Sequence, residues 1–344
     1  MRLIKYDSAF YDKYIKFNEN VYPDRGDIKQ SFQKRLLDNP LLKDKNNPYI
    51  ILALDDNDEI IGQFIISPVE LMYKNEIKQC FFGSDFIVDE KYRNTGAGAL
   101  LALRAIRSFK PYFAIGVSEH AHKIHLSCNT NIAGCAYKYL YLRKRVSTGL
   151  KTIKGIIKHD AQNNNSSSIE FPSEVKTNEY YFQRSSNVND FQTRDYDGDV
   201  IKFVHSKSFL RWRFFSNTDR YAMYVLDKAK QNYFIVRKCS WRGLNLLFIV
   251  DYFFSQRNEM ALKHIIKASQ DISKMCNLDG VITTSSLHIV DGYLKKESFH
   301  VIKNPIWIFA SSYMVPVKDL IDARNAVFIT PADSDYEFNF DNIV

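Results

Sequence analysis

The sequence is short of glycine, which makes up 13 of its 344 residues, where an average chain carries roughly 7%. Two glycines close together are therefore informative, and Gly96 and Gly98 form such a pair. The five cysteines include no two that are separated by only two residues. Because structural zinc sites need that spacing and disulfide frameworks need an even number, we expect no metal and a reducing compartment.

Long apolar runs are also missing. The longest stretch without a charged side chain, residues 304–317, contains two prolines and is shorter than the 18 or more residues that span a bilayer. The N-terminus carries Arg2, Lys5 and Asp7, where a signal peptide needs an unbroken apolar segment. We therefore expect a soluble, cytoplasmic protein that has no membrane partner.

The charge is modestly basic, with 47 Lys and Arg against 39 Asp and Glu, which gives +8. The basic residues are scattered, and the densest cluster is residues 143–145. Nucleic-acid binders carry basic stripes interleaved with aromatics, so we expect no nucleic-acid partner. The hydrophobic fraction of 45% and the charged fraction of 25% are typical of a globular protein, and the length favours about two domains.

The first half of the chain alternates between strand and helix patterns. Acidic turn residues 55–59 separate two apolar runs and indicate a hairpin. Apolar residues on one helical face indicate a helix after the glycine pair. The predicted elements are a strand at 2–6, helices at 8–20 and 27–38, strands at 49–54, 60–66, 79–88 and 112–117, and helices at 95–109 and 127–141.

Residues 158–173 are polar and centre on an Asn- and Ser-rich run at 163–168, which is loop chemistry. We therefore predict a first domain at 1–160, a linker at 161–175 and a second domain at 176–344. The second half repeats the order of elements, with strands at 200–204, 221–226, 233–238, 245–253 and 280–284 and helices at 206–215, 258–276 and 287–296. The predicted fold is α/β in the mixed α+β sense, with two tandem domains that each have a mostly antiparallel central sheet flanked by helices.

The glycine pair lies where the predicted strand 79–88 passes through a basic turn into a helix, in the pattern Arg93-x-x-Gly96-x-Gly98. Glycines let backbone N–H groups approach a ligand closely, and the helix directs its positive end to the same place. A pyrophosphate suits such a turn. On these residues alone, a turn that only caps the helix stays an alternative.

This loop and the element order resemble the GNAT superfamily of acyl-coenzyme A dependent N-acyltransferases, over residues 1–150. The family's loop reads Arg/Gln-x-x-Gly-x-Gly/Ala after the fourth strand. Residues 133–140, which include Tyr137, resemble its A-x-x-x-Y-x-x-L-G-F helix, although Tyr141 and Leu142 replace the final Gly-Phe. The resemblance implies acyl-coenzyme A as cosubstrate, bound by Val88, Arg93, Asn94, Thr95, Gly96, Ala97, Gly98 and Ala99.

The second half contains the aromatic and basic run at 208–214, then Tyr221 and Tyr224, a strand that ends at Asp251 and Tyr252, and the late segment at 330–335. These features resemble the double-GNAT proteins of surface-polysaccharide synthesis, in which one module binds acyl-coenzyme A and the other is a degenerate copy. No glycine pair follows the strand at 248–253, so this turn cannot cradle pyrophosphate as the first can. The resemblance implies an acceptor that is a nucleotide-linked amino sugar, such as a dTDP-3-amino-3,6-dideoxyhexose. The candidate acceptor-binding residues are Arg211, Trp212, Arg213, Tyr221, Asp251, Asp333 and Asp335.

Transfer from a thioester to an amine requires the ammonium to lose a proton and the leaving thiolate to gain one. Asp85 is a candidate base whose pKa burial would raise, or else a turn aspartate. His120 is a second candidate base, with Glu119 and His122 as rivals beside it. Tyr137 is the candidate acid for the thiolate, or else a packing residue.

The sequence thus favours an enzyme that moves an acetyl or 3-hydroxybutyryl-type group onto a dTDP-linked amino sugar by direct attack, as a monomer or homodimer. Two alternatives stay open. A tRNA-dependent aminoacyl transferase of the peptidoglycan type also pairs two such modules, but the intact loop at Gly96 and Gly98 disfavours it. A non-catalytic protein that binds sugar nucleotides would need that loop to be a relic.

Overall fold

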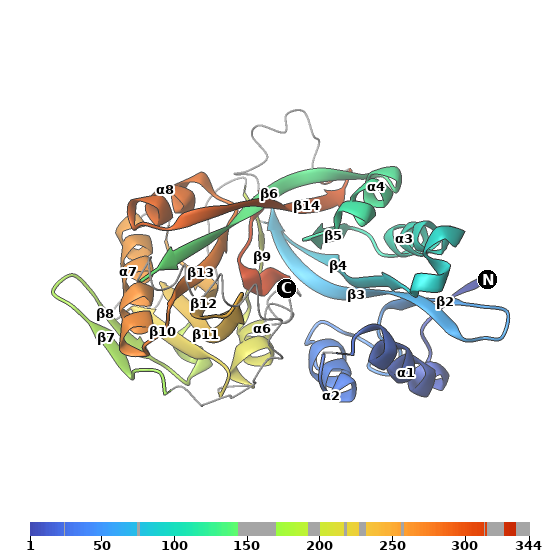
Figure 1. The fold of residues 1–344 in the computed structure, drawn as a ribbon, viewed down its shortest axis with the longest axis horizontal. Helices are drawn as coiled ribbons and strands as arrows, with labels where there is room; N and C mark the ends of the chain where they lie inside the picture. Colours follow the sequence, from blue (N-terminus) through green and yellow to red (C-terminus); the bar gives the residue numbers. More distant parts are fainter. Residues whose placement is uncertain are drawn as a thin grey trace. The chain divides into compact units, whose positions relative to one another are not determined.

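The computed structural model folds into two compact units, each built from several chain segments (Figure 1). Unit 1 comprises Met1–Cys135, Ile201–Val204 and Ile306–Val327, and unit 2 comprises Ala136–Val200, His205–Pro305 and Phe328–Val344. The structure describes residues 1–23, 25–73, 76–143, 170–191, 200–216, 219–226, 232–255, 258–312, 314 and 327–334.

The division between the units falls inside strand β6 (Thr130–Leu142), ahead of the predicted linker at 161–175. Residues 161–169 of that linker lie outside the described residues. Phe171 and Val175 are 7% and 3% exposed, and both belong to the core of unit 2. The apolar side chains of residues 170–175 are therefore packed in unit 2.

The sheet of unit 1 has the order β1-β2-β3-β4-β5-β14. Neighbouring strands in this order are antiparallel, except that β4 and β5 are parallel. A short strand, β9, pairs with the end of β3. The strands are β1 (Arg2–Lys5), β2 (Ile50–Leu54), β3 (Ile60–Tyr73), β4 (Glu76–Val88), β5 (Tyr112–Ile115), β9 (Ile201–Phe203) and β14 (His300–Ser311), of which the C-terminal half lies in unit 1.

Helices cover both faces of this sheet (Figure 1). Side chains alternate between the faces of a strand, so in β2 Ile50 and Leu52 pack with the residues of α1 and α2, while Ile51 and Ala53 pack with those of α3. Every residue of β2 is buried. The helices are α1 (Tyr11–Val21), α2 (Ile28–Phe32, followed by a π-helical turn at Gln33–Leu37), α3 (Ala97–Ser108) and α4 (Glu119–Ser127).

In unit 2 the sheet order is β6-β13-β12-β11-β10-β8-β7, antiparallel except for β12 with β13. Helix α7 packs against β12 and β13, and α8 packs against α7 and β13. The elements are β7 (Glu174–Lys176), β8 (Tyr181–Arg184), α6 (Lys207–Leu210, with a π-helical turn at Arg211–Phe215), β10 (Ala222–Leu226), β11 (Tyr233–Trp241), β12 (Leu244–Phe253), α7 (Glu259–Met275), β13 (Gly280–Ser285) and α8 (His288–Lys296). The division between the units also falls inside the short strand β15 (Val327–Phe328).

The mixed fold with mostly antiparallel sheets is confirmed, but the predicted helix at 127–141 is wrong. Helix α4 ends at Ser127, and β6 occupies Thr130–Leu142. Tyr137, Tyr139 and Tyr141 alternate with other residues, and aromatic residues at a period of two favour a strand. The sequence analysis also missed β7, β8 and β14.

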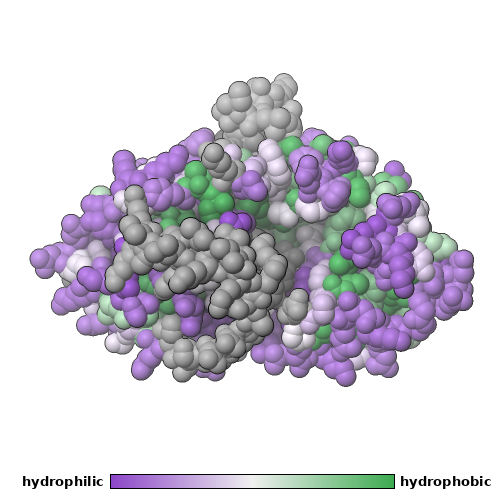
Figure 2. Space-filling view, viewed as in Figure 1, coloured by the Kyte–Doolittle hydropathy of each residue, from purple (hydrophilic) through white to green (hydrophobic). Residues whose placement is uncertain are grey.

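The face shown in Figure 2 is mostly hydrophilic where its residues are described. Across the described part of the chain, exposed large apolar side chains lie at scattered positions, such as Leu100 and Met275. Among the described residues, no helix combines the length and the apolar character needed to cross a membrane.

Candidate functional site

The parallel strands β4 and β5 of unit 1 part after a short ladder. Their pairs are Phe81 with Tyr112, Phe82 with Phe113 and Gly83 with Ala114. Beyond the last pair β4 continues to Val88, and its residues 84–88 form no ladder with β5. We call this parting the unit 1 split. Because both strands run in the same direction, the loops that follow them meet at its open edge.

A glycine turn leads from β4 into α3 at this edge. After a 3₁₀ turn at Glu90–Thr95, Gly96 adopts a left-handed conformation with φ 83°, which glycine tolerates best. The first backbone bond of α3 runs from the N–H of Leu100 to the oxygen of Gly96 at 3.1 Å. The N–H groups of residues 97–99 therefore have no carbonyl partner within the helix and mark its positive end.

The residues expected to bind the cofactor come together around this turn. Arg93 is exposed, and its Nε donates to the oxygen of Val88 at 3.3 Å. A Cβ on Gly98 would lie 3.5 Å from the ring of Phe86 and 3.9 Å from Ile124, which are ordinary contacts. A small side chain at 98 is thus compatible with the fold, and its absence keeps the start of α3 open. Asn94, Thr95 and Ala99 are also exposed, whereas Ala97 is buried.

A β-bulge interrupts β4 just inside the split. Ser84 pairs with Ile65 and Ile87 pairs with Gln63, so two residues of β4, Asp85 and Phe86, face the single residue between those two on β3. Asp85 has φ 45°, a strained backbone conformation for a residue with a side chain.

The bulge residue Asp85 is held by two arginines. Its Oδ1 accepts from Arg25 at 2.6 Å, its Oδ2 lies 3.3 Å from Arg35, and its side chain is 4% exposed. Burial alone would raise the pKa of Asp85, but the charges and hydrogen bonds of Arg35 and Arg25 outweigh burial and hold the pKa below its usual value. The expected rise in pKa is therefore wrong. A carboxylate bound at both oxygens is a weak proton acceptor and a good anchor for the two guanidinium groups.

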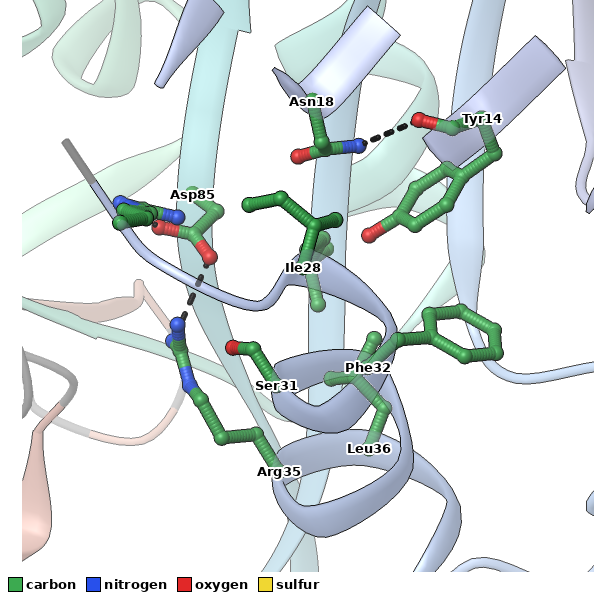
Figure 3. Close-up of a pocket in the computed structure, with 10 residues that line it drawn as sticks. Tyr14, Asn18, Ile28, Ser31, Phe32, Arg35, Leu36 and Asp85 are labelled. Atoms are coloured by element: carbon green, nitrogen blue, oxygen red, sulfur yellow. Dashed lines mark hydrogen bonds and ion pairs between the residues drawn. The ribbon is translucent and has the colours of Figure 1, made fainter. Parts of the chain in front are cut away.

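These side chains line a cavity between α1, α2 and the sheet of unit 1 (Figure 3). We call it the α1–α2 cavity. Its enclosed volume is about 20 Å³. Asn18, one of the lining residues, exchanges side-chain hydrogen bonds of 2.8 and 2.9 Å with Gln63 on β3. The lining residues are Tyr14, Asn18, Arg25, Ile28, Ser31, Phe32, Arg35, Leu36, Ile65 and Asp85.

A buried polar pair lies where β4 and β5 begin to part. The Tyr112 hydroxyl lies 2.9 Å from His125 Nε2, and His125 Nδ1 lies 2.9 Å from the oxygen of Ala121. Burial lowers the pKa of His125 and raises that of Tyr112, so both stay neutral. With Nδ1 donating to a carbonyl, Nε2 accepts from Tyr112. A side chain on Gly83 would collide with the Tyr112 ring, which explains the glycine.

The other predicted catalytic residues are dispersed. His120 is exposed in the first turn of α4, beside Glu119, at the same edge as the glycine turn. His122 packs edge-on against Phe309, with ring centroids 4.9 Å apart. Tyr137 lies on β6, where it pairs with Ser285 in unit 2. Its predicted place on the helix beside the thiolate is wrong.

Two of the predicted acceptor-binding residues meet in unit 2, but inside the core. His205 Nδ1 lies 2.9 Å from Asp251 Oδ2, and its Nε2 lies 2.5 Å from Asp333 Oδ1. Thr330 donates to Asp251 Oδ1 at 2.9 Å, and Tyr233 donates to Oδ2 at 3.1 Å. All three side chains are 0% exposed. These hydrogen bonds join residues 330–333 to the end of β12.

The remaining predicted acceptor-binding residues of unit 2 differ in how far they are exposed to solvent. Arg213 is 7% exposed and donates to the oxygen of Ser334 at 2.9 Å. Tyr221 is 1% exposed and packs edge-on against a phenylalanine. Arg211 is exposed and Trp212 is half-buried. Asp335 lies outside the described residues. Arg213 and Tyr221 are therefore packed in the core of unit 2. Their burial could not be predicted from the sequence.

The sequence analysis missed Arg25, Arg35 and His205. Arginines spaced by ten residues around a short helix form no recognised motif, and a histidine before the helix cap at Ser206 is unremarkable. The bulge in β4 places Asp85 beside Arg25 and Arg35. The end of β12 places Asp251 beside His205. Within the described part of the chain, no group of His, Cys, Asp and Glu side chains is arranged to hold a metal ion.

No protein-family model and no curated protein matches the chain. Solved structures do match over 90% of it. A GCN5-related N-acetyltransferase from Anabaena variabilis has a TM-score of 0.58 at 12% identity, with 72% of its own length covered. N-myristoyltransferase from Saccharomyces cerevisiae with bound myristoyl-CoA has a TM-score of 0.55 at 12% identity, with 82% covered.

A GCN5-related N-acetyltransferase from Kribbella flavida matches at a TM-score of 0.53 and 11% identity, with 70% of its length covered. The chain has the fold of these proteins. This similarity agrees with the predicted fold of GNAT type. The split, the glycine turn and the bulge all lie in unit 1.

Proposed function

We propose that the chain is an acyl-coenzyme A dependent N-acyltransferase. The observation that carries the proposal is the glycine turn at the open edge of the unit 1 split. The N–H groups of residues 97–99, the positive end of α3 and the exposed Arg93 suit a pyrophosphate. The similarity in fold to an N-myristoyltransferase with bound myristoyl-CoA supports the same class of cosubstrate.

The acceptor in this proposal is the amine of a dTDP-linked 3-amino-3,6-dideoxyhexose, used in O-antigen or capsule synthesis, and the acyl group is acetyl or of the 3-hydroxybutyryl type. The amine nitrogen attacks the thioester carbon, the C–S bond breaks, and coenzyme A leaves as the thiol. One proton leaves the nitrogen and one reaches the sulfur. We assign the first transfer to His120, which faces solvent at the open edge, whereas Asp85 is occupied by its arginines.

The function is tested by incubating the full chain with acetyl-CoA or 3-hydroxybutyryl-CoA and with dTDP- or UDP-linked amino sugars. We expect stoichiometric release of free thiol and an amide product seen by mass spectrometry. Binding of acyl-coenzyme A without transfer to any amine would contradict the catalytic function and favour a non-catalytic binding protein.

The role of His120 is tested by His120→Asn, which we expect to lower kcat by about 10²-fold or more while acyl-coenzyme A affinity holds, as loss of a general base does. His122→Asn is the matched control, since His122 packs on Phe309. Near-normal kcat in His120→Asn, with a collapse in Asp85→Asn, would assign the base to Asp85.

A further inference from the structure

A second cavity in unit 1 is larger than the α1–α2 cavity. It lies between the end of α3, the turn that follows α4 and Ser311 of β14, and we call it the α3–α4 cavity. Its volume is about 180 Å³, against about 20 Å³ for the α1–α2 cavity. A cavity of roughly 150 Å³ holds a molecule the size of benzene. The α3–α4 cavity can therefore hold a small organic molecule.

The wall of this cavity contains two cations. Arg107 and Lys110 line it, and no Asp or Glu is among the described residues that do. Neither cation forms a hydrogen bond or an ion pair within the described part of the chain. The C-terminal end of a helix carries about half a negative charge, so the ends of α3 and α4 together offset at most about one of the two positive charges. A net positive charge remains for a ligand.

Polar side chains with spare hydrogen-bonding capacity line the same space. Ser311 is 3% exposed, and its hydroxyl accepts from the N–H of Tyr112 at 2.9 Å. A hydroxyl can also donate, and that of Ser311 donates to no residue that the structure describes. The side-chain amide of Asn129, which also lines the cavity, forms no hydrogen bond with the described residues either. Both groups are donors that an oxyanion can use.

The inner wall is partly apolar. Leu103 is half-buried, and Ile106 and Cys128 are buried. Burial raises the pKa of the Cys128 thiol, and hydrogen bonding to Ser127 and the charge of Arg107 oppose that rise in part. The guanidinium therefore lies close enough to the inner wall to act on a group there. A ligand that joins an acidic group to a short carbon skeleton matches both parts of the cavity.

We infer that the α3–α4 cavity binds a small organic anion. Its acidic group, a phosphate or a carboxylate, lies at Arg107 and Lys110, and its carbon skeleton packs against Leu103. Arginine can form paired hydrogen bonds with either acidic group. The site is separate from the glycine turn, because α3 runs for 12 residues from Ala97 to Ser108, a length of roughly 18 Å. The inference does not depend on the acyl transfer proposed above.

Calorimetry on the full chain at constant, low ionic strength tests this inference. Two pairs of probes differ by the acidic group: glycerol 3-phosphate against glycerol, and succinate against succinamide. We expect at least one anion to bind tenfold or more tightly than its neutral partner. The pair that shows the preference identifies phosphate or carboxylate. No preference in either pair, including no detectable binding, overturns the inference.

Substitutions of the two cations locate the anion. Arg107→Gln and Lys110→Gln should each lower the affinity by roughly fivefold, and the double variant should abolish the preference. Arg104→Gln is the control and should keep it, since Arg104 is exposed on the same helix but does not line the cavity. An anion could also occupy the glycine turn, so Arg93→Gln is a second control. Loss of the preference in Arg93→Gln, with its retention in Arg107→Gln, would overturn the inference.

A cavity-filling variant separates the cavity from its exposed charges. Leu103→Trp enlarges a half-buried wall residue and leaves both cations in place. We expect it to abolish anion binding while cooperative unfolding in urea is retained. Full anion binding in folded Leu103→Trp would place the anion on the surface and contradict the inference. Where the larger side chain prevents folding, the variants at the exposed positions Arg107 and Lys110 decide.

Discussion

The two units contain the same strand arrangement with different contents. In unit 2, β12 and β13 also form three parallel pairs and then part. There, however, Thr283 donates to the oxygen of Ile249 and Tyr252 donates to that of Thr284, each at 3.2 Å. These side chains bridge the parting strands. In unit 1 the split leads instead to a bulge and a glycine turn, whereas side-chain hydrogen bonds join the separating strands of unit 2.

An aspartate follows the ladder in each unit, and the contrast between them is instructive. Asp85 lies beside two part-exposed arginines at the wall of a cavity, whereas Asp251 is fully buried against His205. Position in the sequence suggested a catalytic or substrate role for both. Their surroundings make Asp85 part of a cavity wall and Asp251 part of the core.

The largest effect should come from removing the buried histidine of unit 2. His205→Gln removes the ring that hydrogen-bonds two adjacent buried carboxylates, and leaving buried charged groups without a hydrogen-bond partner costs about 3 kcal/mol or more. Urea denaturation should show this loss. The control is His288→Gln, at an exposed histidine 4.0 Å from Asp291, where we expect less than about 0.5 kcal/mol. Equal effects in both variants would contradict the structural role of the network.

Asp85→Asn should lower the free energy of unfolding by about 2–3 kcal/mol near neutral pH, since it breaks the two ion pairs of a buried carboxylate. The pKa of Asp85 is lowered below 3.8 in the folded state, so its contribution is full above about pH 4 and disappears as the pH falls through the folded-state pKa. The difference from the unmodified chain should therefore shrink in acid. The control Asp58→Asn breaks an exposed pair and should change stability far less. A difference that grew in acid would refute the ion pairing.

Gly98→Val should weaken acyl-coenzyme A binding at least tenfold, because two further methyl groups would crowd the N–H groups at the start of α3. Calorimetry measures this directly. Gly292→Val in α8 is the control, since nothing lies within 4 Å of its Cβ position. Unchanged affinity in Gly98→Val would refute the turn as the pyrophosphate site.

Tyr252→Phe should destabilise the chain by about 1 kcal/mol, the value of one buried hydrogen bond, without changing acyl-coenzyme A affinity. Tyr112→Phe, which removes the bond to His125, should cost a similar amount. A second equivalent of acyl-coenzyme A bound by Tyr252→Phe would mean that unit 2 is closed by this bond alone, and would overturn the contrast between the units.

The sequence predicted the parts whose signals are local. Alternating apolar runs located β2 and the start of β3, and glycine and helix periodicity located the turn at Gly96 and α3. It failed at β6, where the family motif predicts a helix and the alternation of tyrosines indicates the strand that is observed. It could not predict the partners of Asp85 and Asp251, because those depend on a bulge and on contacts with residues far apart in the chain.

Hydrogen exchange with and without acetyl-CoA tests the central claim most directly, that unit 1 holds the cosubstrate and unit 2 does not. Bound pyrophosphate would occupy the N–H groups at the start of α3 and slow their exchange. We predict protection of residues 84–100 and no change in residues 244–262. Protection of residues 244–262, or unchanged exchange at 93–100 in chain saturated with acetyl-CoA, would contradict the account.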